Sequence, residues 1–299
     1  MRTHSAAIRR PTPLIAASAV FLFCAGTCSA DPFFFSTGNP NNLMATASRP
    51  DVGAFEIESA DDFVLTHSTT ITSATFTGLI VSSGPAVPTL GQIVVEIYRV
   101  FPTDSDVGRT SGPPTFSTSQ VPTRVNSPSD VALDTRDSSV AGQLSFTTTE
   151  LSASFTALNS VQPGGIHPIP NQQTLGNGAV TGEELQFNIT FTSPFLLSAD
   201  HYFFVPQVEV TGGTFLWLSA PKPIVPPGTP FPAGSSDLQE WTRDAFLDPD
   251  WLRVGTDIVG TGAFNATFSL TGTTPEPGTV VLVGAGLLAV WWWRRKTKR

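Results

Sequence analysis

The chain has 299 residues, of which 24 are acidic and 16 are Lys or Arg, so its formal net charge is −8. Three of the cations lie before residue 11 and five lie after residue 293. Residues 31–276 therefore hold eight cations against all 24 acids, a net charge of −16. A domain this acidic excludes nucleic acid as a partner, because phosphate binding needs a basic surface, and it suits a soluble extracellular protein.

The first 30 residues have the pattern of a secretory signal peptide. Three arginines come first, residues 14–26 are apolar apart from one serine, and Cys28-Ser29-Ala30 forms a small-residue cleavage site. We therefore expect signal peptidase to remove residues 1–30. Both cysteines of the chain lie in this segment, so the mature protein should have no disulfide, no thiol nucleophile and no Cys-bound zinc.

Residues 31–271 are predicted to form one β-rich domain. Alternating apolar and small polar residues predict strands within 62–66, 71–81, 92–98, 185–192, 202–210, 214–219 and 263–270. The best helical pattern is 235–246, where Leu238, Trp241 and Ala245 could form an apolar stripe. Many strands without alternating helices predict an antiparallel β-sandwich or jelly roll.

Three long connections separate these predicted strands. Residues 102–137, 162–182 and 220–234 are rich in Pro, Gly, Ser, Thr and Asn, but strands of the same kind continue on both sides of each. We interpret them as surface loops of a single sandwich, where binding sites are often found, rather than as linkers between domains. Residues 271–275 are expected to be a short spacer after the domain.

Residues suited to catalysis or metal binding are scattered along this domain. Its three histidines, at 67, 167 and 201, lack the spacing of a metal motif, and no GxSxG motif is present. We therefore expect no enzymatic activity, no catalytic residue and no cofactor other than a structural Ca²⁺ ion, for which Asp61 or the pair Asp248 and Asp250 would be ligands. Asp61 and Asp62 are adjacent in a strand, so they should point to opposite faces and not act as a facing pair. A secreted hydrolase that uses Asp248 and Asp250 remains an alternative.

Three tryptophans of the domain are candidates for contact with a sugar. Carbohydrate-binding β-sandwiches stack sugar rings on exposed aromatic side chains. Trp241 and Trp251 lie among charged residues, and Trp217 lies in a predicted strand of which one face must be core. A carbohydrate-binding module with contacts at Trp217, Trp241 and Trp251 is therefore the main alternative function.

Residues 272–299 carry the most specific pattern in the sequence. The motif Pro275-Glu276-Pro277 precedes the uncharged apolar segment 279–293, and the basic residues Arg294, Arg295, Lys296, Lys298 and Arg299 end the chain. As a helix, the apolar segment would span about 22 Å, short of the roughly 30 Å hydrocarbon core of a bilayer. Interfacial tryptophans and snorkelling basic side chains favour a single transmembrane helix with a cytoplasmic C-terminus.

This tail resembles the PEP-CTERM sorting signal of Gram-negative-type bacteria. The resemblance implies processing by a membrane-embedded exosortase near Pro-Glu-Pro and cargo that often accompanies exopolysaccharide. Residues 59–65 and the following strand also resemble the opening "ADDF" strand pair of many β-rich cargo proteins of this family, and residues 264–271 resemble their closing strand. We therefore expect an exported, non-enzymatic protein that is anchored transiently in the inner membrane and then reaches the cell surface or extracellular matrix.

Overall fold

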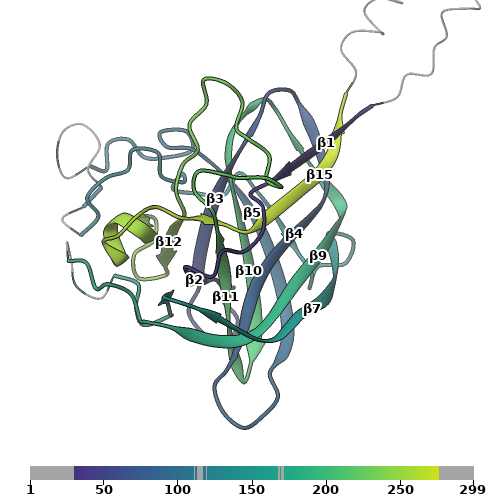
Figure 1. Ribbon diagram of the computed structural model, residues 1–299. Helices are drawn as coiled ribbons and strands as arrows, with labels where there is room; N and C mark the ends of the chain where they lie inside the picture. The colour runs from purple at the N-terminus through teal and green to yellow at the C-terminus, as the bar shows by residue number, and fades with distance from the viewer. Residues whose placement is uncertain are drawn as a thin grey trace, which may run out of the picture. The chain divides into compact units, whose positions relative to one another are not determined.

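The computed structural model describes residues 30–275 except 111, 113–116, 119, 168, 170 and 171. Residues 32–274 form one compact unit whose regular elements are β-strands, apart from one short helix (Figure 1). The strands are β1 (Asp31–Ser36), β2 (Ala45–Ala47), β3 (Ile57–Leu65), β4 (Thr69–Ser82), β5 (Thr89–Arg99), β6 (Asp134–Asp137), β7 (Leu144–Ala157), β8 (Ser160–Val161), β9 (Val180–Leu197), β10 (Asp200–Thr211), β11 (Gly213–Ala220), β12 (Trp241–Asp244), β13 (Leu252–Arg253), β14 (Asn265–Ala266) and β15 (Phe268–Thr274). A short π-helix, η1 (Val254–Val259), follows β13.

The strands form two sheets, as a β-sandwich requires. In the nine-stranded sheet the order is β1-β15-β4-β11-β2-β8, while β9 pairs with β4 and β7, and β14 pairs with β11. In the six-stranded sheet the order is β13-β12-β3-β10-β5-β6. All strand pairs except β2 with β8 are antiparallel where their register is defined. The prediction of an all-β antiparallel sandwich is confirmed at this level.

The main core contains phenylalanines from both sheets. Phe76 of β4 is stacked on Phe187 of β9 with 4.8 Å between ring centroids, and Phe204 of β10 is stacked on Phe268 of β15 at 5.1 Å. These residues belong to one buried cluster with Phe63 and Leu65 of β3. Because side chains alternate along a strand, the same strands present their remaining residues to the opposite face.

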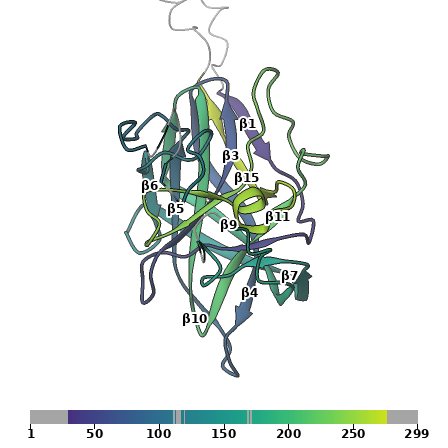
Figure 2. The same ribbon diagram turned by 90° about the vertical axis from the view of Figure 1, so that its left-hand side faces the viewer.

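The outer face of the six-stranded sheet is also covered. Ala60, Tyr98, Phe203 and Val205, on β3, β5 and β10, form a second buried cluster with Leu238, Trp241 and Trp251. Trp241 lies on β12, the neighbour of β3 in this sheet, and Leu238 and Trp251 lie in the segments before and after β12 (Figures 1 and 2). Polar residues on this face are therefore enclosed by protein, and this is where the candidate site lies.

Three local expectations differ from the structure. The predicted helix 235–246 is wrong, because residues 241–244 form β12, which pairs with β3. Residues 271–274, expected as a spacer, instead complete β15. Strand β7 is long but was not predicted, and most of its side chains are exposed, so its sequence carries little apolar alternation.

The two predicted targeting segments fall almost entirely outside the described residues. The signal peptide 1–30 lies outside the described residues apart from Ala30, and so does the predicted transmembrane helix 279–293. Within the described part of the chain, no helix has the length and apolar character needed to cross a membrane.

Candidate functional site

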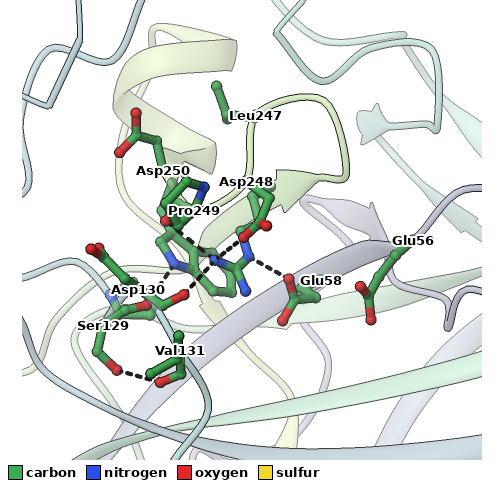
Figure 3. A network of polar contacts seen from close by, with 12 residues as sticks. Glu56, Glu58, Ser129, Asp130, Val131, Leu247, Asp248, Pro249 and Asp250 are labelled. Carbon is green, nitrogen blue, oxygen red and sulfur yellow. Dashed lines mark hydrogen bonds and ion pairs between the residues drawn. The ribbon is translucent and has the colours of Figure 1, made fainter. Parts of the chain in front are cut away.

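A network of buried charges lies on the outer face of the six-stranded sheet (Figure 3). Glu58 comes from β3, Tyr98 from β5 and Arg243 from β12. Arg243 forms an ion pair with Glu58, and the Tyr98 hydroxyl donates a hydrogen bond to Glu58 Oε1 at 2.6 Å. The register of β12 and β3 places Arg243 directly opposite Glu58, so the sheet itself brings these two charges together.

Arg243 is the centre of this network. Its guanidinium lies 4.3 Å from the centre of the Trp251 ring and donates to the Tyr98 oxygen at 2.9 Å and to the Pro249 carbonyl at 3.2 Å. It also pairs with Asp248 at 2.8 Å. Burial, the largest single effect, lowers the pKa of Arg243, but the charges of Glu58, Tyr98 and Asp248 and the hydrogen bond to Glu58 together raise it above its ordinary value, so the residue stays cationic.

Three glutamates meet beside this arginine. Glu56, Glu58 and Glu96 each place a carboxylate oxygen within 4.8 Å of the others, and Figure 3 shows Glu56 and Glu58 side by side. Burial, followed by the charge of Glu58, raises the pKa of Glu96 to about 8. Burial and the charge of Glu58 also raise the pKa of Glu56. None of these three residues was predicted as a site residue, because Glu96 follows Glu58 and Glu56 by 38 and 40 positions in the chain.

The acid pair selected from the sequence does not converge on one ligand. Asp248 binds Arg243, whereas Asp250 binds Arg109 and accepts a hydrogen bond from Ser117. The two carboxylates are therefore bound by two different arginines. The expected Ca²⁺ site and the alternative hydrolase at Asp248 and Asp250 do not agree with this arrangement, because both need two carboxylates directed at the same species.

The three histidines have separate surroundings. His201 forms a 2.6 Å contact with Asp62 Oδ2, which also accepts the Leu238 backbone N–H. His67 is exposed next to Thr66, and His167 lines a cavity described below. Asp61 instead accepts the Ala266 backbone N–H. Asp61 and Asp62 thus have different partners, as expected of neighbours in a strand.

Asp61 and Glu240 are fully buried acids. Both are 0 % exposed, and within the described residues Asp61 Oδ1 and both carboxylate oxygens of Glu240 accept no hydrogen bond. Burial raises the pKa of Glu240 to about 8, and the Thr46 hydroxyl beside it offsets only part of this effect. Burial, followed by the charge of Asp62, raises the pKa of Asp61 well above its ordinary range.

We expect stability to fall as the pH rises from about 5 to 8. The native state keeps the Glu240 proton up to about pH 8, whereas the unfolded chain loses it near 4.5, so folding binds a proton in this range. The contribution of Glu240 to the free energy of unfolding is fully present below the pKa that this residue has in the unfolded chain. Above that pH it declines by at most about 1.4 kcal/mol per pH unit. Glu240→Gln should flatten the dependence, measured by urea unfolding at several pH values. The exposed Glu150→Gln is the control, and equal slopes for both variants would contradict the assignment.

The three candidate sugar-binding tryptophans are buried. Trp217, Trp241 and Trp251 are 0 %, 1 % and 2 % exposed. Trp217 donates from Nε1 to the Thr267 carbonyl at 2.8 Å, and Trp251 donates to the Ser129 carbonyl at 3.1 Å. None of them offers an exposed ring face, so the structure corrects the expectation that they stack on a sugar.

A cavity of about 630 Å³ is lined by none of the residues that form the charge network. Gln120, Gln172 and Gln173 line it together with His167 and the ion pair of Arg253 with Asp257. Amides and a paired arginine and carboxylate can donate and accept hydrogen bonds with hydroxyl groups. Glu58 and Glu96 do not line this cavity.

Comparison with known proteins identifies the C-terminal segment. Residues 273–296 match the family model of the PEP-CTERM protein-sorting motif. The chain is therefore an exported protein that is sorted by exosortase, with a signal that targets it to the cell surface or the extracellular space. Searches of curated proteins and of solved structures find no match to the chain. Of the motif Pro275-Glu276-Pro277, only Pro275 is described, and it is exposed; the basic residues from Arg294 onward lie outside the described residues.

Proposed function

We propose that the chain is a non-enzymatic β-sandwich of the bacterial cell surface or extracellular matrix, associated with exopolysaccharide. In this proposal signal peptidase removes residues 1–30, the helix 279–293 anchors the protein transiently in the inner membrane, and exosortase then processes it near Pro275-Glu276-Pro277. The basic residues from Arg294 onward keep the C-terminus in the cytoplasm until processing.

One observation carries this proposal. The matched motif begins at residue 273, and β15, the last strand of the sandwich, ends at Thr274. The residues of the two buried clusters described above, and of a third that includes Met44, Leu79 and Leu216, all lie before residue 271. Cleavage after this point would therefore release a sandwich with its whole core, which is what a sorting signal on a folded cargo requires.

The charge network favours a structural role over catalysis. Glu58 is paired with Arg243 whereas Glu96 has a raised pKa, and a hydrolase can use two such carboxylates as its base and its acid. Hydrolysis, however, also needs space for a substrate between the two carboxylates. Here Tyr98 bridges them, with its hydroxyl 2.6 Å from Glu58 and 3.2 Å from Glu96. Screening of the purified protein against glycosides and esters should give no turnover; activity lost on Glu58→Gln would overturn the non-enzymatic proposal.

Replacing Pro275, Glu276 and Pro277 by alanine should leave the full-length protein in the membrane fraction. The two prolines keep the segment extended, and alanines would allow a helix to propagate through it, which would hide the backbone from a peptidase. The measurement is immunoblotting of membrane and extracellular fractions of the producing bacterium. Alanines at Ser83, Pro85 and Val87, in an exposed loop, form a matched control that should be processed normally. Unchanged processing of the motif variant would contradict the proposed role of the motif.

Carbohydrate binding is a second candidate, and the 630 Å³ cavity favours it. Its amide side chains, rather than the buried tryptophans, would contact the sugar hydroxyls. A pull-down with exopolysaccharide of the producing bacterium tests this function, with Gln173→Ala as the variant that should bind less. Equal binding by the wild type and Gln173→Ala would remove the cavity as the binding site.

A further inference from the structure

Four oxygen-bearing side chains meet on the outer face of the six-stranded sheet. Glu58 lies on β3, Glu96 on β5 and Gln207 on β10, which is the strand between them, and Glu56 immediately precedes β3. The carboxylate oxygens of the three glutamates lie within 4.8 Å of one another. Ca²⁺ binds oxygen ligands at about 2.3–2.6 Å, so ligands on opposite sides of one ion are about 4.8 Å apart.

Gln207 provides an independent indication of a ligand. Its side chain is 1 % exposed, and its amide nitrogen donates to Glu56 Oε1 at 2.9 Å, which holds the amide at the glutamate cluster. Its Oε1 atom accepts no hydrogen bond from any described residue. A buried amide oxygen without a donor is costly, and a cation would supply the missing positive partner.

The negative charges of the cluster are only partly balanced by a cationic side chain. Among the three glutamates, Glu58 is paired with Arg243, which also binds Asp248. Among the described residues, Glu56 and Glu96 accept side-chain hydrogen bonds only from neutral groups: the amide of Gln207 for Glu56, and the hydroxyls of Tyr98 and Thr135 for Glu96. Two carboxylates thus lack a cationic partner, and two charges are what Ca²⁺ provides.

We propose that Glu56, Glu58, Glu96 and Gln207 form a Ca²⁺ site. The ligand set contains only oxygen, which suits Ca²⁺ and does not suit Zn²⁺ or Cu²⁺, and the longer bonds and flexible geometry of Ca²⁺ fit side chains from three strands better than the strict octahedron of Mg²⁺. Glu56 and Glu96 are half-buried, so an ion can reach the site from solvent. The ion would join β3, β10 and β5 through their side chains. This site is separate from Asp61, Asp248 and Asp250 and does not depend on the proposed surface role.

Calcium titration of the purified protein tests this site. Isothermal titration calorimetry should give an apparent Kd of about 10⁻⁴–10⁻³ M, the range of extracellular calcium modules. Tb³⁺, which replaces Ca²⁺, gives a second readout, because the Tyr98 ring next to the ligands should sensitise its luminescence. Excess Ca²⁺ should abolish that luminescence by competition.

Two variants make the result specific. Glu56→Gln removes a half-buried ligand charge without touching Arg243, and it should weaken Ca²⁺ binding by at least about tenfold, because affinity depends on the number of charged ligands. The exposed Glu150→Gln, on β7, should bind like the wild type. Circular dichroism of each variant checks that the fold is retained. Absence of a calcium-dependent heat in the wild type, or unchanged binding by Glu56→Gln, would overturn the proposal.

Discussion

Replacing Arg243 by alanine should destabilise the sandwich by about 3–5 kcal/mol. The substitution removes the cationic partner of Glu58, which is 4 % exposed and would be left as an uncompensated buried charge. It also removes the hydrogen bonds to Tyr98 and Pro249 and the stacking on Trp251. Chemical unfolding at pH 7 measures the difference in free energy.

A partly solvated ion pair supplies the control for this result. Arg99 and Asp104 are 2.9 Å apart, with 33 % and 28 % of their side chains exposed, so Arg99→Ala should cost at most about 1 kcal/mol. Adding Glu58→Gln to Arg243→Ala should recover part of the loss, because the unpaired charge is removed. An Arg243→Ala variant as stable as Arg99→Ala would show that the buried network contributes little.

Replacing Trp217 by alanine should cost a similar amount, about 3–5 kcal/mol. The ring is 0 % exposed, packs against Phe204 and Phe268 with centroids 6.2 and 6.0 Å away, and donates to the Thr267 carbonyl. Alanine would leave a cavity where β11, β10 and β15 meet and would remove the hydrogen bond from the ring to that carbonyl. Thermal or urea unfolding measures the loss.

Phe34→Ala is the matched aromatic control. Phe34 lies in β1 and is 58 % exposed, so its truncation should change stability by less than about 0.5 kcal/mol. Trp217→Phe should restore much of the packing but not the hydrogen bond, and its stability should lie between those of the wild type and Trp217→Ala. If Trp217→Ala and Phe34→Ala are equally stable, the ring does not support the core as described.

The alternation of apolar and polar residues predicted most of the strands, because a strand that buries one face needs an apolar residue at every second position. Each of the seven predicted ranges overlaps an observed strand, and six of them lie in long strands that supply the main core. Strand β7 was missed because it lies at the edge of its sheet and most of its side chains are exposed. The stripe of Leu238, Trp241 and Ala245 suggested a helix, but pairing with β3 determined the conformation of residues 241–244.

The sequence predicted the candidate site less well than it predicted the strands. Charged neighbours suggested that Trp241 and Trp251 were exposed, but Glu240, Arg243 and Asp250 are themselves buried and most are paired. A charged residue indicates an exposed segment only when water solvates its charge. Arg243 and Asp250 instead form ion pairs inside the protein. Glu96 interrupts the apolar run 93–98 of β5, which is a usable signal, whereas Glu58 lies in a strand that also holds Asp61 and Asp62. Only the strand order β3-β10-β5 shows that Glu58 and Glu96 meet.

The intact mass of the protein recovered from the surface or medium of the producing bacterium tests the central claim most directly. Removal of residues 1–30 and cleavage near Pro275-Glu276-Pro277 predict a species that begins at Asp31 and ends close to that motif, with every strand of the sandwich retained. Recovery of a species that still carries the apolar segment and the basic residues up to Arg299 would contradict processing by exosortase.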